Sequence, residues 1–260
     1  MSRQQTRAFV LGLADYRETS KILRLLSEDY GRLSLVARGL TSPKRKTPPP
    51  EPFALVQAGF SLREGKDLGT LASLEIERVF SAPHGSVEAY ALASYWFDVV
   101  GAMAVPGQGG GALFGLTEGF LTNLEAYGVW SVAVWWHFGR LLAVEGLHVR
   151  LDRCMRCEAP GAMVTHVAVA LGSALCARCV TGAEDALPVQ GLSPGGMGGC
   201  LTDPRTPPPA TLLTVRAAES FAAVFDATVV YHAGIAPRSY AFLCETLFRR
   251  AGARHPVPMK

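Results

Sequence analysis

The stretch RAFVLGLADYRETSKILRLLSEDYGRLSLVAR, residues 7–38, decides the fold of the N-terminal part of the chain. It holds three short runs rich in Val, Leu and Phe, which are residues 7–13, 21–27 and 32–38. Residues 28–31 have the composition of a tight hairpin connection. In the third run apolar and polar side chains alternate, so that Leu33, Leu35 and Ala37 point to the same side. This period of two predicts strands joined by hairpins.

Two further apolar runs extend the pattern through the first 80 residues. They are residues 53–63 and 68–80, and residues 65–69 between them carry another turn signal. Five short strands with hairpin turns predict a small barrel. The OB-fold is one such architecture, and an SH3-like barrel fits the pattern nearly as well.

Beyond Pro83 the spacing of apolar residues changes from two to about 3.6, which is typical of helices. Residues 107–111 read as a connector, Gly146 ends a long helix, and Pro237 begins a last one. Residues 192–209 are so rich in Gly and Pro that we expect a loop there. The predicted helical stripes are Leu92, Trp96, Val99 and Met103, then Trp130, Val134, Phe138 and Leu141, then Val215, Ala218, Ala222, Phe225 and Val229, and finally Tyr240, Leu243 and Leu247.

The composition describes a folded protein with an uneven distribution of charge. Of the 260 residues, 49% are hydrophobic and 18% are charged, which excludes disorder over most of the chain. The formal net charge is +3, but residues 1–80 carry 13 basic and 9 acidic side chains, whereas residues 81–152 carry 2 and 6. A basic N-terminal part beside an acidic middle indicates one surface suited to an anionic partner.

The N-terminal sequence MSRQQTRAFV is too polar for the apolar core of a signal peptide. The longest uncharged stretches contain Gly and Pro clusters or a histidine and a cysteine, so none of them reads as a membrane-spanning helix. We therefore expect a cytoplasmic protein without contact to a membrane. Structural disulfides are rare in that compartment, and the six cysteines need another explanation.

Four cysteines form the pattern C-x2-C-x18-C-x2-C, which lies in the spacing range of zinc sites. They are Cys154, Cys157, Cys176 and Cys179. Two cysteines three positions apart in a tight turn offer both thiolates to one ion, and two such turns complete a tetrahedron. Because four thiolates leave no position for water or substrate, we expect one structural Zn2+ ion. Four buried small side chains or a redox-active CxxC pair are the alternatives.

The arginines and cysteines outside this pattern have other expected roles. Arg153, Arg156 and Arg178 lie beside or between the ligands, and we expect them to offset the charge of the centre by donating to the sulfurs. Contact with nucleic-acid phosphate is the alternative for these arginines. Cys200 and Cys244 have no CxxC partner and are expected to be packed thiols.

Basic residues are dense near the N-terminus, with ten Lys or Arg and four Asp or Glu between residues 3 and 46. The densest group precedes a stiff proline segment, and such a loop can follow a phosphate backbone. Arg32 and Arg38 share a strand face over about 20 Å, and tyrosines near turns offer stacking faces for bases. A basic loop is otherwise a solvated face, and a tyrosine beside a turn packs on its own hairpin. The candidates for nucleic-acid contact are Arg32, Arg38, Lys44, Arg45 and Lys46, followed by Lys21, Arg24, Tyr16 and Tyr30.

Known catalytic signatures do not occur in the sequence. The glycine-rich segments PGQGGG and SPGGMGG lack the Lys and the hydroxyl of a GxxxxGK[ST] phosphate loop. There is no GxSxG or HExxH motif, and the H-x-E that a zinc deaminase requires is also missing. We therefore expect a protein that is not an enzyme.

Several segments together resemble the RecO family of bacterial recombination mediators. They are A-x-V-L from Ala8, YRETSKIL from Tyr16, LLSEDYG from Leu25, VARG from Val36, PFAL from Pro52, the four cysteines and Arg238-Ser239. The resemblance spans the whole chain and is strongest in residues 8–60 and at the cysteines. Two departures stand out: Glu158 follows Cys157 where zinc knuckles frequently have a Gly, and the segment at residues 47–50 is unusually rich in proline.

The resemblance implies an α+β protein, with an OB-fold barrel at residues 1–80 and an all-α helical domain at 81–150 and 183–260. A zinc finger at residues 151–182 is inserted into that domain. It also implies binding of single- and double-stranded DNA, annealing of complementary strands without ATP, and cooperation with RecR. Single-strand-binding protein and RecA are the implied indirect partners, and the implied location is the nucleoid. Arg32, Arg38 and the segment Lys44–Lys46 belong to the implied DNA-binding face.

Three rival functions are weighed at this level. A zinc-containing enzyme such as a nuclease or deaminase would show metal-dependent turnover, and the missing motifs argue against it. The protein can be a zinc-stapled scaffold whose acidic helical middle binds protein partners and whose basic residues are only solvated. An RNA-directed role is also compatible, because OB-type surfaces bind either nucleic acid. Salt-sensitive DNA binding distinguishes the expected function from the scaffold.

Overall fold

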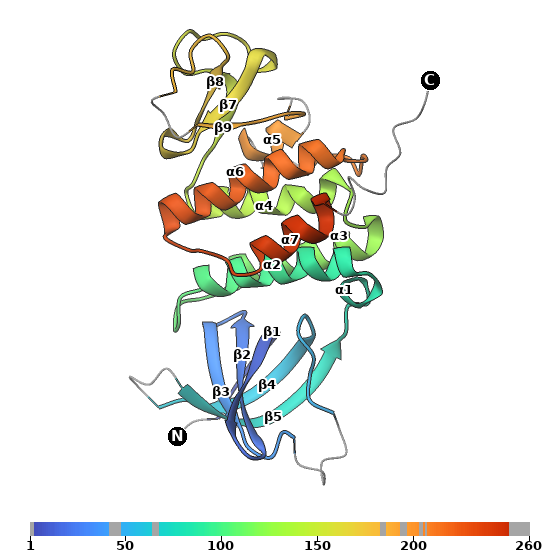
Figure 1. Ribbon diagram of the computed structural model, residues 1–260. Coiled ribbons are helices and arrows are strands. Elements are labelled where there is room, and N and C mark those ends of the chain that lie inside the picture. Colours follow the sequence, from blue (N-terminus) through green and yellow to red (C-terminus); the bar gives the residue numbers. More distant parts are fainter. Residues whose placement is uncertain are drawn as a thin grey trace.

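The computed structural model of the protein describes residues 3–41, 48–63, 68–182, 186–192, 197–202, 205 and 207–249. A β-barrel, a layer of helices and a small β-sheet lie one above another, with the barrel and the sheet on opposite sides of the helices (Figure 1). In the part of the chain that is described, no helix combines the length and the apolar character that crossing a membrane requires.

The N-terminal part is a closed barrel of five strands. The strands are β1 (Gln4–Arg17), β2 (Ser20–Ser27), β3 (Gly31–Ala37), β4 (Leu55–Ser61) and β5 (Leu68–Arg78). Their order is β1-β2-β3-β5-β4, in which β4 closes antiparallel on β1 and β5 runs parallel to β3. A barrel of simple consecutive hairpins would have no parallel pair, so this connection identifies the barrel as an OB-fold. The SH3-like alternative is wrong for this chain.

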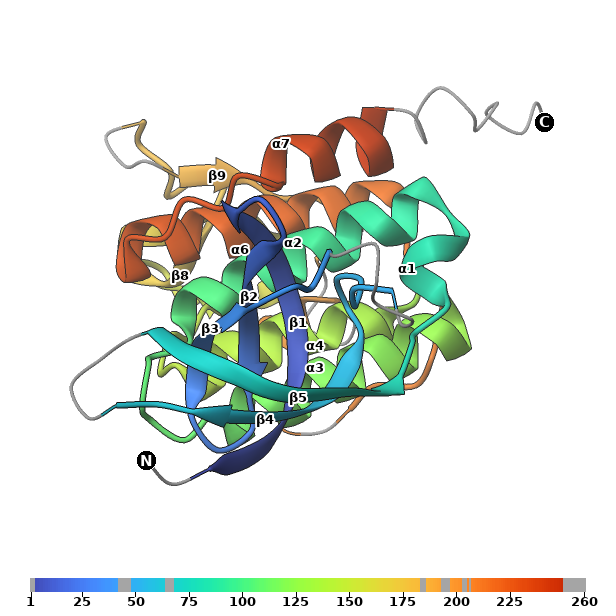
Figure 2. The same cartoon turned by 90° about the horizontal axis from the view of Figure 1, so that it is seen from below.

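The alternation predicted for the third strand is confirmed. Leu33 and Leu35 are buried inside the barrel, whereas Arg32 and Arg38 are exposed on its outer side. Figure 2 shows the barrel strands in front of the helical layer. The outer sides of β2 and β3 carry basic residues, and the surface that they form lies next to the helical layer.

The barrel is joined to the helices by an apolar contact. Phe9 on β1 is fully buried against two helical residues, with ring centroids 6.1 Å from Phe97 and 5.0 Å from Phe114. Leu26 on β2 belongs to the same hydrophobic core as the helices. Burying side chains of this size contributes about 1.5–3 kcal/mol each. The junction between barrel and helices is therefore a packed interface.

The glycine-rich segment PGQGGG secures this junction. The backbone N–H of Gly107 donates to the carbonyl of Tyr30 at 3.0 Å, and that of Gly110 donates to the carbonyl of Glu28 at 3.0 Å. At Gly31, where φ is +63°, a Cβ atom would lie 2.2 Å from the carbonyl oxygen of Val105. The hairpin between β2 and β3 thus docks on the connector between two helices, and only glycines allow this approach.

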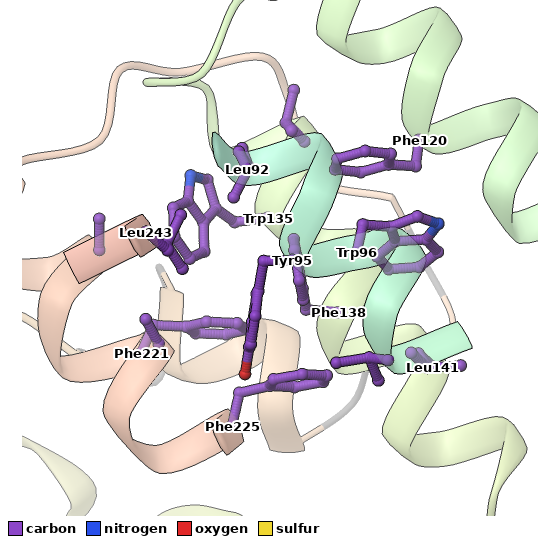
Figure 3. Packing of buried hydrophobic residues seen from close by; sticks show 14 of the residues in the cluster. Leu92, Tyr95, Trp96, Phe120, Trp135, Phe138, Leu141, Phe221, Phe225 and Leu243 are labelled. Carbon is purple, nitrogen blue, oxygen red and sulfur yellow. The ribbon is translucent and has the colours of Figure 1, made fainter. Parts of the chain in front are cut away.

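The helical layer is built on buried aromatic residues, shown in Figure 3. Trp96 stacks on Phe120 at 4.7 Å and meets the edge of Phe138 at 5.0 Å, and such pairs add about 0.5–1.5 kcal/mol beyond their burial. The indole N–H of Trp96 donates to Thr117 Oγ1 at 3.1 Å. The helices are α1 (Ala82–Gly85), α2 (Val87–Met103), α3 (Gly111–Tyr127), α4 (Val132–Val144), α5 (Met197–Thr202), α6 (Val215–Ala233) and α7 (Tyr240–Leu243), the last continued by a π-helical turn, η3 (Cys244–Arg249).

The expectation of a continuous loop over residues 192–209 is wrong, because α5 lies within it. Met197, Cys200 and Leu201 are buried at helical spacing against α4. A Cβ atom at Gly139 of α4 would lie 1.8 Å from the carbonyl oxygen of Cys200, so the two helices meet backbone to backbone. Tertiary packing overrides the low helix propensity of the sequence MGGCLT.

The third part is a four-stranded sheet with the order β6-β8-β7-β9. Its strands are β6 (Arg150–Cys154), β7 (Val164–Ala168), β8 (Ser173–Cys176) and β9 (Ala186–Pro188), with two short 3-10 turns, η1 (Gly161–Met163) and η2 (Val169–Leu171). It follows α4 directly and returns to the helical layer through α5, so it is an insertion between helices.

Candidate metal centre and nucleic-acid interface

The four cysteines predicted to bind metal form one cluster at the small sheet. Their Sγ atoms all lie within 4.8 Å of one another, and the Sγ atoms of Cys157 and Cys176 are 3.7 Å apart. Four sulfurs at about 2.3 Å from a tetrahedral ion are separated by about 3.8 Å. The cluster therefore has the dimensions that a four-coordinate metal ion requires, and the predicted convergence of these cysteines is confirmed.

Each cysteine pair occupies the end of a strand and the turn that follows. Cys154 ends β6 and Cys176 ends β8. The N–H of Glu158 donates to the carbonyl of Cys154 at 3.0 Å, and the N–H of Val180 donates to that of Cys176 at 3.2 Å, which closes two similar turns. Glu158 has a φ of 58°, the left-handed region that favours glycine. Its carboxylate pairs with Arg153 at 2.9 Å.

The thiols of the cluster ionise unequally. Burial disfavours the thiolate of Cys154, but hydrogen bonds from backbone groups, that of Cys176 first, outweigh it and lower the pKa of Cys154 to about 6. Hydrogen bonds of its sulfur with Cys157 and Cys176 raise the pKa of Cys179 to about 12. One negative charge therefore forms readily, whereas four thiolates together require a bound cation.

The arginines beside the ligands differ in what they contact. Arg153 is held by the carboxylates of Asp152 at 3.0 Å and Glu158 at 2.9 Å, so the expected donation to sulfur is not found for this side chain. Arg156 donates to the backbone carbonyl of Cys179 at 2.7 Å and supports the second turn. Burial raises the pKa of the Cys176 thiol, but hydrogen bonds that include one from the backbone of Arg178 lower it overall.

Arginines on the outer surface of the barrel gather in two grooves. The first, which we name the junction groove, has a volume of about 770 Å³ and lies between strands β1–β3 and helix α2. The second, the distal groove, has a volume of about 800 Å³ and lies at the β1–β2 turn and the beginning of β5. Of the predicted residues, Arg24 and Arg32 line the junction groove, and Arg38 and Tyr16 line the distal groove.

The two grooves meet along β3. Ser34 lines the junction groove and Val36 lines the distal groove, and these residues are neighbours on the outward side of the strand. A basic track therefore runs from Arg32 to Arg38 over about 20 Å.

Other predicted residues are not brought into either groove. Lys21 forms an ion pair with Asp15 and lines neither groove. Tyr30 packs edge-on against Phe60 at 5.3 Å, within the partly buried shell of the barrel core. Lys44–Lys46 lies outside the described residues.

Four groove residues were missed by the sequence reasoning. Arg17 and Arg63 line the distal groove, and both flank turns at the same end of the barrel, which a barrel topology could have indicated. Arg238 and Tyr90 line the junction groove from the helical part. In the sequence Arg238 stands out only as part of a family motif, and no sequence pattern indicates Tyr90 as a nucleic-acid contact.

The arginines of the grooves differ from the others in their partners. Arg7 contacts three glutamates at 3.2–3.7 Å, and Arg78 pairs with Glu125 at 2.7 Å. Among the described residues, no carboxylate lies within ion-pair distance of the groove arginines, which are Arg17, Arg24, Arg32, Arg38, Arg63 and Arg238. Unpaired cations lining grooves attract a polyanion.

These features define a class of protein: an OB-fold barrel with basic grooves, joined to a helical domain that carries a four-cysteine centre. The family model described as "Recombination protein O N terminal" matches residues 1–91, and that described as "Recombination protein O C terminal" matches residues 84–192. The chain belongs to the RecO family.

Individual relatives agree with this assignment. The DNA repair protein RecO of Anaeromyxobacter dehalogenans strain 2CP-1 is 32% identical over 219 residues, which cover 80% of this chain and 86% of the relative. That of Desulforudis audaxviator is 30% identical over 244 residues, covering 94% and 97%. That of Pelotomaculum thermopropionicum is 31% identical over 183 residues, covering 70% of each chain.

Proposed function

We propose that this protein is a DNA-binding mediator of recombinational repair and not an enzyme. Membership of the RecO family supports a role in DNA repair and recombination. The observation that carries the proposal is the set of unpaired arginines in two grooves that meet on the outer side of an OB-fold barrel. Such surfaces bind the nucleic-acid backbone through charge and tolerate any base sequence.

The proposed activity is the annealing of complementary strands without ATP, on both single- and double-stranded DNA. Two single strands repel each other, and a surface that neutralises phosphates on both of them lowers that repulsion. With RecR, the protein would help RecA to load on DNA coated with single-strand-binding protein. It would act in the cytoplasm at the nucleoid, without contact to a membrane.

The four cysteines are proposed to hold one structural Zn2+ ion. Tetrahedral thiolate coordination is typical of this metal, and the spacing of the sulfurs fits it. The ion would supply the positive charge that four thiolates need and would fix the two turns of the small sheet. Within this proposal the OB-fold covers residues 1–80, the helical domain 81–150 and 183–260, and the zinc finger 151–182.

The test is annealing of complementary strands that are already coated with single-strand-binding protein, in the absence of ATP and at several salt concentrations. Neutralising about six phosphates predicts a slope near −4 in a plot of log affinity against log salt for a single strand. Absence of salt-sensitive binding by the folded, metal-loaded protein contradicts the proposal and leaves the scaffold function.

A separate variant tests the contribution of the basic segment Lys44–Lys46 to DNA binding. Replacing Lys44, Arg45 and Lys46 by Ala should reduce the slope by about 2, because each phosphate contact contributes about 0.7. Arg216→Ala is the control, since this exposed arginine on α6 lines neither groove. Unchanged affinity in the triple variant would show that DNA does not reach this loop.

A further inference from the structure

The junction groove is built by two parts of the chain that are far apart in sequence. One wall consists of the barrel residues Arg24, Arg32 and Ser34. The other wall comes from α2, which contributes Tyr90, and from the segment just before α7, which contributes Arg238. Occupation of this groove would therefore engage the barrel and the helical part at once.

The charges on the two walls point to an anionic occupant. Arg24 and Arg32 lie on adjacent strands, where Arg24 is paired with Ser34, two residues from Arg32. Diagonal neighbours of this kind are about 7–8 Å apart, so the two guanidinium groups lie within reach of neighbouring phosphates. Arg238 faces them as a third exposed cation, and none of the three has an ion-pair partner among the described residues.

The carboxylate of Asp98 also lines the groove, where it is hydrogen-bonded to Ser239. Its Oδ2 accepts hydrogen bonds from the N–H of Ser239 at 3.1 Å and from the Oγ of Ser239 at 3.0 Å. These bonds tie the segment before α7 to α2. Asp98 thereby positions the backbone next to Arg238, and none of the ion pairs among the described residues joins it to the three arginines. Three cations therefore share the groove with one carboxylate.

Tyr90 adds an aromatic surface to the charged groove. Its ring meets Phe53 edge-on at 5.5 Å and lies 6.4 Å from Phe242, and these contacts hold its position. The residue nevertheless remains 42% exposed. A fixed aromatic ring beside cations is the arrangement on which an unpaired base stacks, and bases of a duplex are not available for this.

We infer that the junction groove binds one segment of single-stranded DNA, with Arg238 as a phosphate ligand and Tyr90 as a base-stacking surface. This inference rests on the proposed function, because it assigns two residues of the helical part to the same strand. That strand would continue along β3 into the distal groove, over about 20 Å, a span of several phosphates.

The test measures binding of a labelled oligo(dT) strand by anisotropy between 50 and 400 mM salt, using the full-length, metal-loaded protein. Arg238→Ala should reduce the log–log salt slope by about 0.7 and weaken binding about fivefold at 0.1 M salt, the value of one phosphate contact on a single strand. Arg216→Ala removes the same charge from an arginine that hydrogen-bonds Gln190 at 3.2 Å outside the groove, and it should leave slope and affinity unchanged.

Variants of Tyr90 should differ from those of Arg238 in their effect on the salt slope. Tyr90→Leu should weaken binding about fivefold or more without altering the salt slope, because stacking releases no counterion. Tyr90→Phe keeps the ring and should bind as the unmodified protein does. Equal melting temperatures confirm that the variants fold, and Arg238→Gln replaces Arg238→Ala if the alanine variant melts early.

The outcomes separate this inference from the proposed function. If the unmodified protein shows no salt-dependent binding, the proposed function fails. If it binds, and the Arg238 and Tyr90 variants both retain its affinity and slope, the proposed function stands and the inference is overturned. A loss of affinity in Arg216→Ala equal to that in Arg238→Ala also overturns it, since the effect would then follow net charge alone.

Discussion

Asp226→Asn is expected to stabilise the protein at neutral pH. Asp226 lies on α6, partly buried, and its Oδ1 accepts a hydrogen bond from the hydroxyl of buried Tyr95 at 2.9 Å. Burial raises the pKa of this carboxyl to about 6 from an ordinary value of 3.8, and the bond from Tyr95 offsets only part of that rise. Burial also raises the pKa of Tyr95, which keeps its hydroxyl protonated as the donor.

The sign and the magnitude follow from proton linkage. Between pH 4 and pH 6 the folded state binds a proton that the unfolded state has lost, so stability falls as pH rises through this window. The two pKa values differ by about two pH units, which sets an upper limit of about 3 kcal/mol. Because the carboxyl is only partly buried, solvent screening reduces this cost to about 1–2 kcal/mol. Asn keeps the acceptor for Tyr95 and removes the ionisation.

Thermal melting of the metal-loaded protein between pH 5 and pH 8 measures the effect. At pH 7 the variant should melt about 2–6 °C higher, and its advantage should shrink by about half at pH 5. Glu125→Gln is the control with opposite sign, because Glu125 accepts hydrogen bonds from Ser81 and Arg78, and these outweigh burial and lower its pKa. An advantage of Asp226→Asn that does not change with pH would refute the linkage argument.

Three further variants test other parts of the structure. Cys176→Ser should lower metal content, measured by elemental analysis, and melting temperature together, because structural metal binding contributes to folding. Gly139→Ala would place a Cβ atom 1.8 Å from the carbonyl oxygen of Cys200, and denaturant titration should show a loss of about 2–3 kcal/mol. Arg7→Met leaves three glutamates without their shared partner, so the melting temperature should drop more at 20 mM than at 500 mM salt.

The strands of the barrel could be predicted because their signal is local. Alternation in residues 32–38 and the hairpin at residues 28–31 predict β3 and the turn before it, which begin within one residue of the observed bounds. The closure of β4 on β1 and the parallel pairing of β5 with β3 are long-range, and no local pattern distinguishes them from an SH3-like arrangement. The same limit applies to α5, whose buried face is created by its contact with Gly139.

The proposed binding surface was only partly predictable for a related reason. In the sequence Arg7 and Arg32 are equivalent, since each is an arginine in an apolar strand. In the structure Arg7 pairs with three glutamates, while Arg32 has no carboxylate within ion-pair distance among the described residues. Tertiary neighbours determine whether an arginine forms an ion pair within the protein or can contact a ligand. The convergence of the four cysteines was correctly predicted from their spacing, because the two cysteines of each pair lie within one turn.

The junction between barrel and helices determines whether the junction groove exists before DNA arrives. The Gly110 N–H bond to Glu28, the close approach at Gly31 and the burial of Phe9 all fix the barrel on the helical layer. Arg32 and Arg238 are thereby held on opposite walls, and a hydrogen bond from Arg32 to the carbonyl of Gly101 on α2 at 3.5 Å adds to these contacts. The proposed binding of DNA would then need no domain closure, which removes an ordering cost from the affinity. Under the proposed function, a bound phosphate backbone would also relieve the repulsion among the groove arginines.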